Sequence, residues 1–191
     1  MRLMTIIGFS SLIILFATLA CSHKAKHAAD IIDWMDEEYM LKNEGWIPTE
    51  QEIIAQIERL AAEEYFCKET DLYMIEAAAA LDKPVVLRYL LDQGVSPNPE
   101  SRGVALCQAI QSGNQQSVLA LIDYGANLNA VSGSNDDTPL HWAAYEGEYW
   151  AVDLLISKGA NPNIENRKGL TVVDFANNNS DIELQRRFKV K

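Results

Sequence analysis

Residues 138–163 read TPLHWAAYEGEYWAVDLLISKGANPN, and this stretch decides the fold of the chain. Apolar residues recur at helical spacing on both sides of a break at Gly147, and the second apolar run stops at Gly159. A glycine in that place adopts the left-handed conformation that closes a helix. The stretch therefore predicts two short helices followed by a turn.

The same pattern recurs along the chain at a fixed period. Gly94, Gly125 and Gly159 are spaced by 31 and 34 residues, and an asparagine follows each of them after four residues. Three further columns lie in the same register: Ile75, Leu106, Leu140 and Val173; Ala78, Ala109, Ala143 and Ala176; and Leu90, Leu121 and Leu155. Because one helix pair cannot bury both of its faces, such repeats must stack on one another.

The stretch that begins with Thr138 and Pro139 resembles a complete ankyrin repeat, with Trp142 in place of the usual leucine. Residues 103–136 resemble a second repeat that has lost this motif. Residues 71–102 resemble a degenerate one with Asp82 at the inner glycine position, and residues 167–191 resemble a truncated closing repeat. The resemblance implies an all-α ankyrin-repeat solenoid, with about three repeats plus a C-terminal capping repeat, in a domain that spans residues 67–191.

The segment before the repeats has helical patterns of its own. Thr49 and Glu52 have the spacing of a capping box ahead of an apolar face, which predicts a helix from about residue 50 to 64. Residues 30–41 predict an acidic helix whose apolar side consists of Ile31, Ile32, Met35 and Tyr39. We expect residues 30–66 to form an acidic N-terminal helical cap over the open end of the repeats.

The composition is that of a globular protein with an acidic surface. Of the 191 residues, 48% are hydrophobic and 23% are charged, and 16 basic against 27 acidic residues give a net charge of -11. This balance argues against a surface that binds nucleic acid. Residues 30–76 contain 14 acids and three bases, a pattern typical either of a solvated helix face or of a contact surface for a basic partner.

Residues 1–20 have the shape of an export signal, since Arg2 precedes an apolar stretch that ends at Ala20. Residues 17–21, Ala-Thr-Leu-Ala-Cys, resemble the lipobox of bacterial lipoproteins, in which the cysteine is acylated and becomes the new N-terminus. The resemblance implies lipidation of Cys21, a tether over residues 21–29 and, because Ser22 follows the cysteine, a periplasmic protein anchored to the outer membrane. Two alternatives stay open, namely a cut that releases a soluble periplasmic protein and an uncleaved anchor.

The sequence contains no recognisable catalytic constellation. It has no serine elbow, no glycine-rich phosphate loop and no Cys-x-x-Cys pair. His23 and His27 lie in the expected tether, where two ligands do not define a metal site. The ankyrin resemblance implies that His141 bonds to its threonine and to neighbouring backbone. We therefore expect no enzymatic activity, no catalytic residue, no metal, no cofactor and no small-molecule substrate.

Cys67 and Cys107 would be the two thiols that remain after acylation of Cys21 in an oxidising compartment. The repeat register places them in adjacent layers. A disulfide between them and a pair of buried free thiols are both open interpretations.

Ankyrin proteins generally bind other proteins through the hairpin tips and the exposed side of each first helix. Carried over by register, the partner-binding positions are Glu69, Thr70, Leu81, Glu100, Ser101, Gln111, Ser112, Ser134, Asn135, Asp137, Tyr145, Glu146, Trp150, Arg167 and Lys168. Tyr145 is the expected centre, because exposed aromatic residues are frequent hot spots. For the polar positions, simple solvation is the competing interpretation.

These features together predict a noncatalytic periplasmic ankyrin-repeat lipoprotein that binds a protein partner. One role is that of a scaffold or stabiliser of an envelope protein. The alternative is an immunity protein that neutralises a toxic effector delivered into the periplasm, for which an acidic surface would suit a basic toxin.

Overall fold

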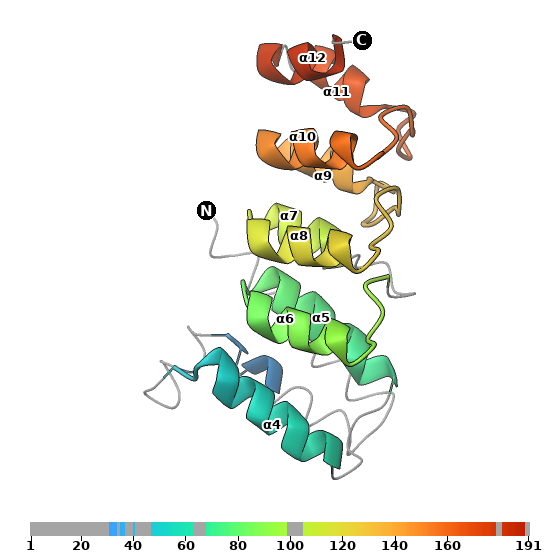
Figure 1. The fold of residues 1–191 in the computed structure, drawn as a ribbon. Coiled ribbons are helices and arrows are strands. Elements are labelled where there is room, and N and C mark those ends of the chain that lie inside the picture. The colour runs from blue at the N-terminus through green and yellow to red at the C-terminus, as the bar shows by residue number, and fades with distance from the viewer. Residues whose placement is uncertain are drawn as a thin grey trace. The chain divides into compact units, whose positions relative to one another are not determined.

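The computed structural model describes residues 31–33, 35, 36, 40, 47–62, 68–98, 105–178 and 181–189. The chain forms two compact units that divide between Ser96 and Pro97. Within the described residues the secondary structure is helical, apart from one isolated antiparallel bridge between Ser132 and Asp137. The described helices are labelled in Figure 1. None of them is both long and apolar enough to cross a membrane.

The first unit contains helices α4 (Glu50–Ala62), α5 (Lys68–Ala80) and α6 (Pro84–Asp92). Helix α5 pairs with α6, and α4 packs against α6. Upstream of α4, residues 31–33, 35 and 40 are helical. Of the four residues expected on the apolar side of the helix predicted for 30–41, Ile31, Ile32 and Met35 are buried, whereas Tyr39 lies outside the described residues. Met40 is buried as well.

Helix α4 begins where the capping-box pattern predicts. The Thr49 backbone N–H donates to Glu52 Oε2 over 2.8 Å, and the Glu52 N–H donates to Thr49 Oγ1 over 3.3 Å. The Thr49 N–H and the Thr49 hydroxyl, which also donates to Glu52 Oε2 over 2.9 Å, hold the pKa of the Glu52 carboxyl below its usual value. The apolar face behind the cap buries Ile53 and Ile57, in agreement with the predicted apolar face.

The second unit contains three helix pairs in succession: α7 (Ala105–Gln111) with α8 (Gln115–Asp123), α9 (Pro139–Glu146) with α10 (Tyr149–Ser157), and α11 (Val172–Asn178) with α12 (Ile182–Lys189). The first helices make the contacts from layer to layer, α7 with α9 and α9 with α11. Figure 1 shows these layers one after another along the unit. The arrangement buries the predicted leucine and alanine columns of these layers, from Leu106 and Ala109 to Ala176, except for Val173, which is half-buried.

Each second helix except α12 ends at a left-handed glycine, as the sequence predicts. The φ angles are 87° at Gly94, 85° at Gly125 and 95° at Gly159. In each case the backbone N–H of the residue after the glycine donates to the carbonyl of the leucine column in the second helix, as Ala160 N–H does to Leu155 O over 2.9 Å. Two backbone hydrogen bonds thus close each of these helix ends and satisfy carbonyls that would otherwise lack partners.

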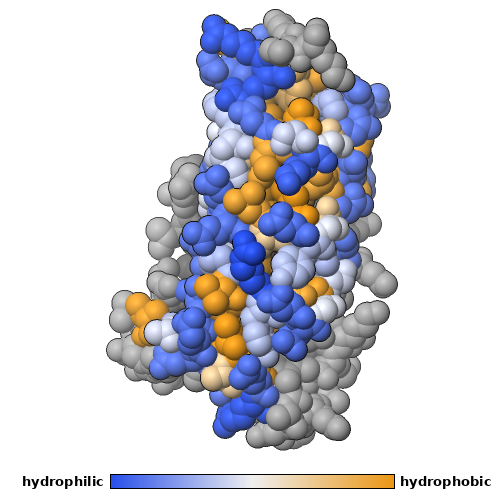
Figure 2. Space-filling model, in the orientation of Figure 1, coloured by the Kyte–Doolittle hydropathy of each residue, from blue (hydrophilic) through white to orange (hydrophobic). Residues whose placement is uncertain are grey.

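The asparagine column connects successive repeats. Asn98 Oδ1 accepts from the Asn127 N–H over 2.5 Å, and Asn129 Oδ1 accepts from the Asn161 N–H over 2.8 Å. Each bond crosses from one repeat to the next, so the column fixes the spacing of the layers within the second unit. Figure 2 shows apolar residues gathered over α10 and polar residues over α12, which carries Arg186 and covers that end of the unit.

Candidate protein-binding face

The candidate site lies on the first helices α9 and α11 and on the two hairpins that precede them, residues 132–137 and 166–170. We call this surface the first-helix face. Its most exposed large apolar side chain is Tyr145, which is 69% exposed. The next most exposed large apolar side chain among the described residues is Ile182 of α12, at 62%.

Three aromatic rings meet on this face, and we call Trp142, Tyr145 and Phe175 the aromatic patch. The ring centroids of Trp142 and Tyr145 lie 6.4 Å apart with an edge-to-face angle of 79°. Those of Tyr145 and Phe175 lie 6.1 Å apart at an angle of 53°. Both distances are in the range of favourable aromatic pairs, so two half-buried rings hold the exposed one in place.

The indole of Trp142 is fixed by a further bond. Its Nε1–H donates to Ser132 Oγ over 3.0 Å, which ties α9 to its hairpin. Trp142 and Phe175 are separated by 33 residues and occupy the same register position in consecutive repeats. The patch therefore arises from one repeat column, with Tyr145 placed one helical turn after Trp142 on α9.

His141 positions α9 through contacts within its own repeat and with the next one. Its ring Nδ1 lies 2.8 Å from Thr138 Oγ1 and accepts from the Thr138 N–H over 3.3 Å, and its own N–H donates to Thr138 Oγ1 over 3.4 Å. The other ring nitrogen, Nε2, lies 3.1 Å from the carbonyl oxygen of Leu170 in the next repeat. The predicted structural role of His141 is confirmed by these contacts.

Helix α11 uses a carboxylate at the equivalent position. The backbone N–H and the hydroxyl of Thr171 donate to Asp174 Oδ2 over 3.0 and 2.6 Å. These bonds hold the pKa of Asp174 below its usual value, so the carboxylate is ionised near neutral pH. The cap sets the start of α11 and so the position of Phe175, which follows directly.

The two hairpins are bound to each other. The Arg167 guanidinium forms an ion pair with Asp136 at 2.9 Å, and the Arg167 N–H donates to the Asn135 carbonyl over 2.7 Å. Asn166 Nδ2 donates to Asp137 Oδ1 over 2.8 Å. The hairpins thus form one connected edge beside the aromatic patch.

The predicted contact positions have different surroundings in the structure. Seven are exposed: Gln111, Ser112, Ser134, Tyr145, Glu146, Arg167 and Lys168. Four are half-buried: Leu81, Asn135, Asp137 and Trp150. Arg167 is exposed but already paired with Asp136. Glu69 and Thr70 belong to α5, with side chains outside the described part, and Glu100 and Ser101 lie outside the described residues.

Two members of the aromatic patch are absent from the predicted contact positions. Trp142 is noted in the sequence only as a replacement for leucine, and Phe175 is not singled out. The register column that aligns the two residues is the signal that would have found them. Trp150, predicted at the edge, donates its Nε1–H to Glu148 Oε2 over 2.6 Å instead.

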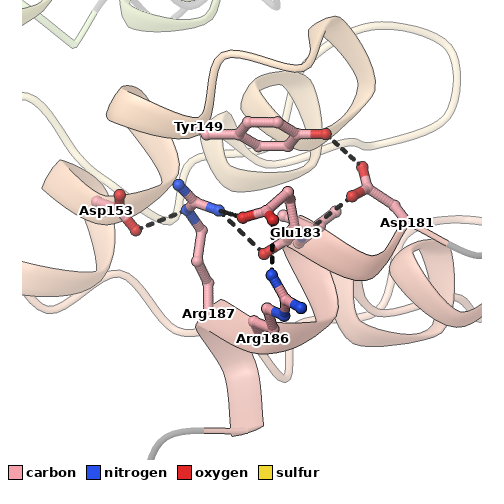
Figure 3. A network of polar contacts seen from close by, with 7 residues as sticks. Tyr149, Asp153, Asp181, Glu183, Arg186 and Arg187 are labelled. Atoms are coloured by element: carbon pink, nitrogen blue, oxygen red, sulfur yellow. Dashed lines mark hydrogen bonds and ion pairs between the residues drawn. The ribbon is translucent and has the colours of Figure 1, made fainter.

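Tyr149 belongs to the C-terminal closure of the unit. Its hydroxyl donates to Asp181 Oδ2 over 2.8 Å, and this bond raises the pKa of the phenol. The Arg187 guanidinium lies 4.7 Å from the centre of the Tyr149 ring and forms ion pairs with Asp153 and Glu183. Figure 3 shows that this network joins α10 to α12.

Cys107 is buried on α7 and has no disulfide partner among the described residues. Burial raises its pKa to about 12, so the thiol is protonated and unreactive at neutral pH. Cys21 and Cys67 lie outside the described residues, so lipidation and the pairing of Cys67 with Cys107 stay predictions. Among the described side chains no group of three could hold a metal ion. What the first-helix face offers is contact area, aromatic rings and charge.

Comparison with known proteins identifies the repeats. A family model described as ankyrin repeats (three copies) matches residues 74–166. This match and the succession of helix pairs confirm the predicted all-α ankyrin-repeat fold.

Several much larger proteins are similar to part of the chain. Palmitoyltransferase Hip14 of Drosophila melanogaster is 34% identical over 89 residues, which are 46% of this chain and 14% of that protein. Palmitoyltransferase AKR1 of Kluyveromyces lactis is 30% identical over 118 residues, which are 62% of this chain and 15% of that protein. The human ARF GTPase-activating protein GIT2 is 33% identical over 82 residues, which are 43% of this chain and 11% of that protein. The chain spans 11 to 15% of the length of these relatives.

Proposed function

Because residues 74–166 are ankyrin repeats, we propose that this chain is a noncatalytic module that grips a protein partner with the first-helix face around Tyr145. Ankyrin repeats are protein-interaction modules that build extended binding surfaces. The observation that carries the assignment of the face is the 69% exposure of Tyr145 between two supporting rings. A large aromatic side chain left in water at that level has no role in the core of the unit.

The geometry favours tight contact for a physical reason. A side chain that is ordered before binding loses little conformational entropy in the complex. Tyr145 is held between Trp142 and Phe175, and the hairpins beside it are joined through Arg167. The face is therefore preorganised where the partner is proposed to dock.

We place this module in the periplasm, anchored to the outer membrane by a lipid on Cys21. Support comes from the sequence, in the signal-like residues 1–20 and the lipobox-like residues 17–21. A soluble periplasmic form is the alternative location. In either case the partner is an envelope protein or a protein that enters the envelope.

The favoured role is that of a scaffold or stabiliser of an envelope protein. The alternative, an immunity protein, is supported by the 14 acidic residues between positions 30 and 76, which would attract a basic toxin. Deletion separates the two roles. A fitness defect in pure culture indicates the scaffold, whereas healthy growth alone combined with killing by sibling cells indicates immunity.

The direct test is capture of the partner from envelope extract by the purified mature chain, followed by mass spectrometry and titration of the identified protein. Tyr145→Ala is expected to weaken binding by at least about 1 kcal/mol, because truncation removes the central exposed ring. The matched control is Tyr124→Ala, since Tyr124 is an exposed tyrosine at the end of α8.

Thermal unfolding of both variants should match that of the native chain to within a few degrees. An unchanged affinity for Tyr145→Ala would remove the first-helix face from the proposal.

A further inference from the structure

The chemistry of the first-helix face narrows the class of partner that fits it. The exposed Tyr145 ring presents a π-face, which carries partial negative charge and attracts a cation. Trp142 meets Tyr145 edge to face, and Phe175 is tilted against it at 53°. These two rings stabilise the position of Tyr145 while leaving most of its surface in water.

The first-helix face also carries carboxylates on both of its helices and in a hairpin. Glu146 is exposed and follows Tyr145 directly, Asp174 precedes Phe175, and Asp137 lies at the start of α9. Asp137 and Asp174 bond to neutral donors, namely the Asn166 amide and Thr171, so these bonds bring no positive charge to either carboxylate. None of the three forms an ion pair with another described residue.

The arginine of this face already forms an ion pair within the face. Arg167 Nε and Nη2 lie 3.1 and 2.9 Å from Asp136 Oδ2, so the two charges neutralise each other. The remaining basic group of the hairpins is Lys168, which is exposed. Three unpaired carboxylates against one lysine leave the surroundings of the aromatic patch negative.

The second unit holds an arginine by this chemistry elsewhere. Arg187 lies 4.7 Å above the ring of Tyr149 and pairs with Asp153 at 2.9 Å (Figure 3). There a tyrosine ring and a carboxylate one helical turn apart on α10, together with Glu183 of α12, hold a guanidinium. Tyr145 and Glu146 present the same two kinds of group to solvent, at adjacent positions of α9.

We propose that the first-helix face takes an arginine-bearing basic segment of its partner, with one guanidinium on the Tyr145 ring and paired with Glu146. Arginine suits the site better than lysine, because its planar guanidinium stacks on an aromatic face while it bonds to a carboxylate. This inference rests on the proposed function and names the chemistry of the partner.

The test uses the mature chain and a twelve-residue probe peptide in which four arginines alternate with glycine and serine. Two counterpart peptides carry lysine or glutamine at every arginine position. Binding is measured by calorimetry at physiological ionic strength, and NMR of the Tyr145 ring reports the site. The arginine peptide is expected to bind more tightly than the lysine peptide and at least about fivefold more tightly than the glutamine peptide.

Paired substitutions separate cation binding from apolar burial. Tyr145→Phe keeps the ring and should retain the affinity to within about twofold, whereas Tyr145→Leu keeps the apolar bulk and should lose about fivefold. Glu146→Gln should also weaken binding. Tyr124→Leu, outside the face, is the control and should change nothing.

Equal binding by the Leu and Phe variants would overturn the inference, since attraction to the acidic chain as a whole would then suffice. Equal binding of the arginine and glutamine peptides, or of the arginine and lysine peptides, would overturn it as well. If Tyr145→Ala abolishes capture of the envelope partner while the arginine peptide does not bind, the proposed function stands and this inference fails. If Tyr145→Ala leaves that capture intact, the proposed function fails.

Discussion

In the three repeats whose inner turn the structure describes, the turn between the two helices contains a residue with positive φ, and single residues meet this requirement differently. Gly113 and Gly147 have φ angles of 72° and 74°, and Asp82 occupies the same place with a φ of 54°. Glycine adopts this conformation freely, whereas a residue with a Cβ atom is strained there. The sequence already marks Asp82 as the departure from the repeat pattern.

Replacement of Asp82 should therefore stabilise the protein. Asp82→Gly is expected to raise the free energy of unfolding by about 0.5–1 kcal/mol, because relief of the strained backbone outweighs the entropy that glycine adds to the unfolded chain. Urea denaturation followed by circular dichroism measures the change. The matched reverse substitution, Gly147→Ala, should lower the unfolding free energy by about 1 kcal/mol. A destabilised Asp82→Gly would show that the aspartate side chain contributes more than its strain costs.

Sequence reasoning succeeds at the residue scale where the partners lie close in the chain. The role of His141 follows from a threonine three residues earlier, and the structure confirms it. Arg167, a predicted contact position, is bound to Asp136, 31 residues away. That pairing depends on where the next hairpin lies, which no local pattern specifies.

Helix α6 shows how one element depends on another. Its N-cap residue, Lys83, makes no side-chain capping bond. Glu50 of α4 caps the helix instead, since Glu50 Oε2 accepts hydrogen bonds from the N–H groups of Val85 and Val86 over 2.8 and 3.1 Å. A carboxylate in that place also interacts favourably with the positive end of the helix dipole.

Loss of this remote cap should weaken the first unit. Glu50→Ala is expected to lower the free energy of unfolding by about 1–2 kcal/mol, the usual effect of removing a helix cap. Gln51→Ala is the control, because Gln51 is exposed on the same helix. Thermal and urea unfolding of the two variants measure the difference. Equal stabilities would mean that water replaces the Glu50 carboxylate without loss.

At the element scale too, the sequence predicts contacts between residues close in the chain and misses those between distant residues. The Thr49 and Glu52 cap joins residues three apart and was predicted correctly. The hydrogen bonds to Glu50 span 35 and 36 residues, and the sequence does not predict them. The aromatic patch is similar, because Tyr145 was predicted whereas its contact with Phe175 requires α9 and α11 to be adjacent.

At the scale of the whole molecule, the chain forms two compact units. Sequence motifs separate a cap at residues 30–66 from repeats at 67–191. The structure places α4, α5 and α6 in one unit that ends at Ser96, and the remaining helices in another. The reason is the packing of α4 on α6 and the bonds of Glu50, which join the cap to the first repeat.

The proposed membrane attachment is a property of the whole chain. Cys21→Ser is expected to move the protein from the outer-membrane fraction to the soluble periplasmic fraction, because the acylated thiol would be its attachment. Cell fractionation with immunoblotting, together with labelling by a fatty-acid analogue, measures this. Cys67→Ser is the control and should remain with the membrane. A native chain found in the soluble fraction would contradict lipidation and favour the soluble periplasmic form.

The repeat period, the helix pairs, the glycine turns and the exposure of Tyr145 were determined by the sequence itself, because each depends on residues within one repeat. The tertiary structure alone decided that Glu50 caps α6, that Arg167 is neutralised by Asp136 and that Phe175 supports Tyr145. These contacts join residues about thirty positions apart. They form only after neighbouring layers have packed, so the charge and shape of the first-helix face follow from packing.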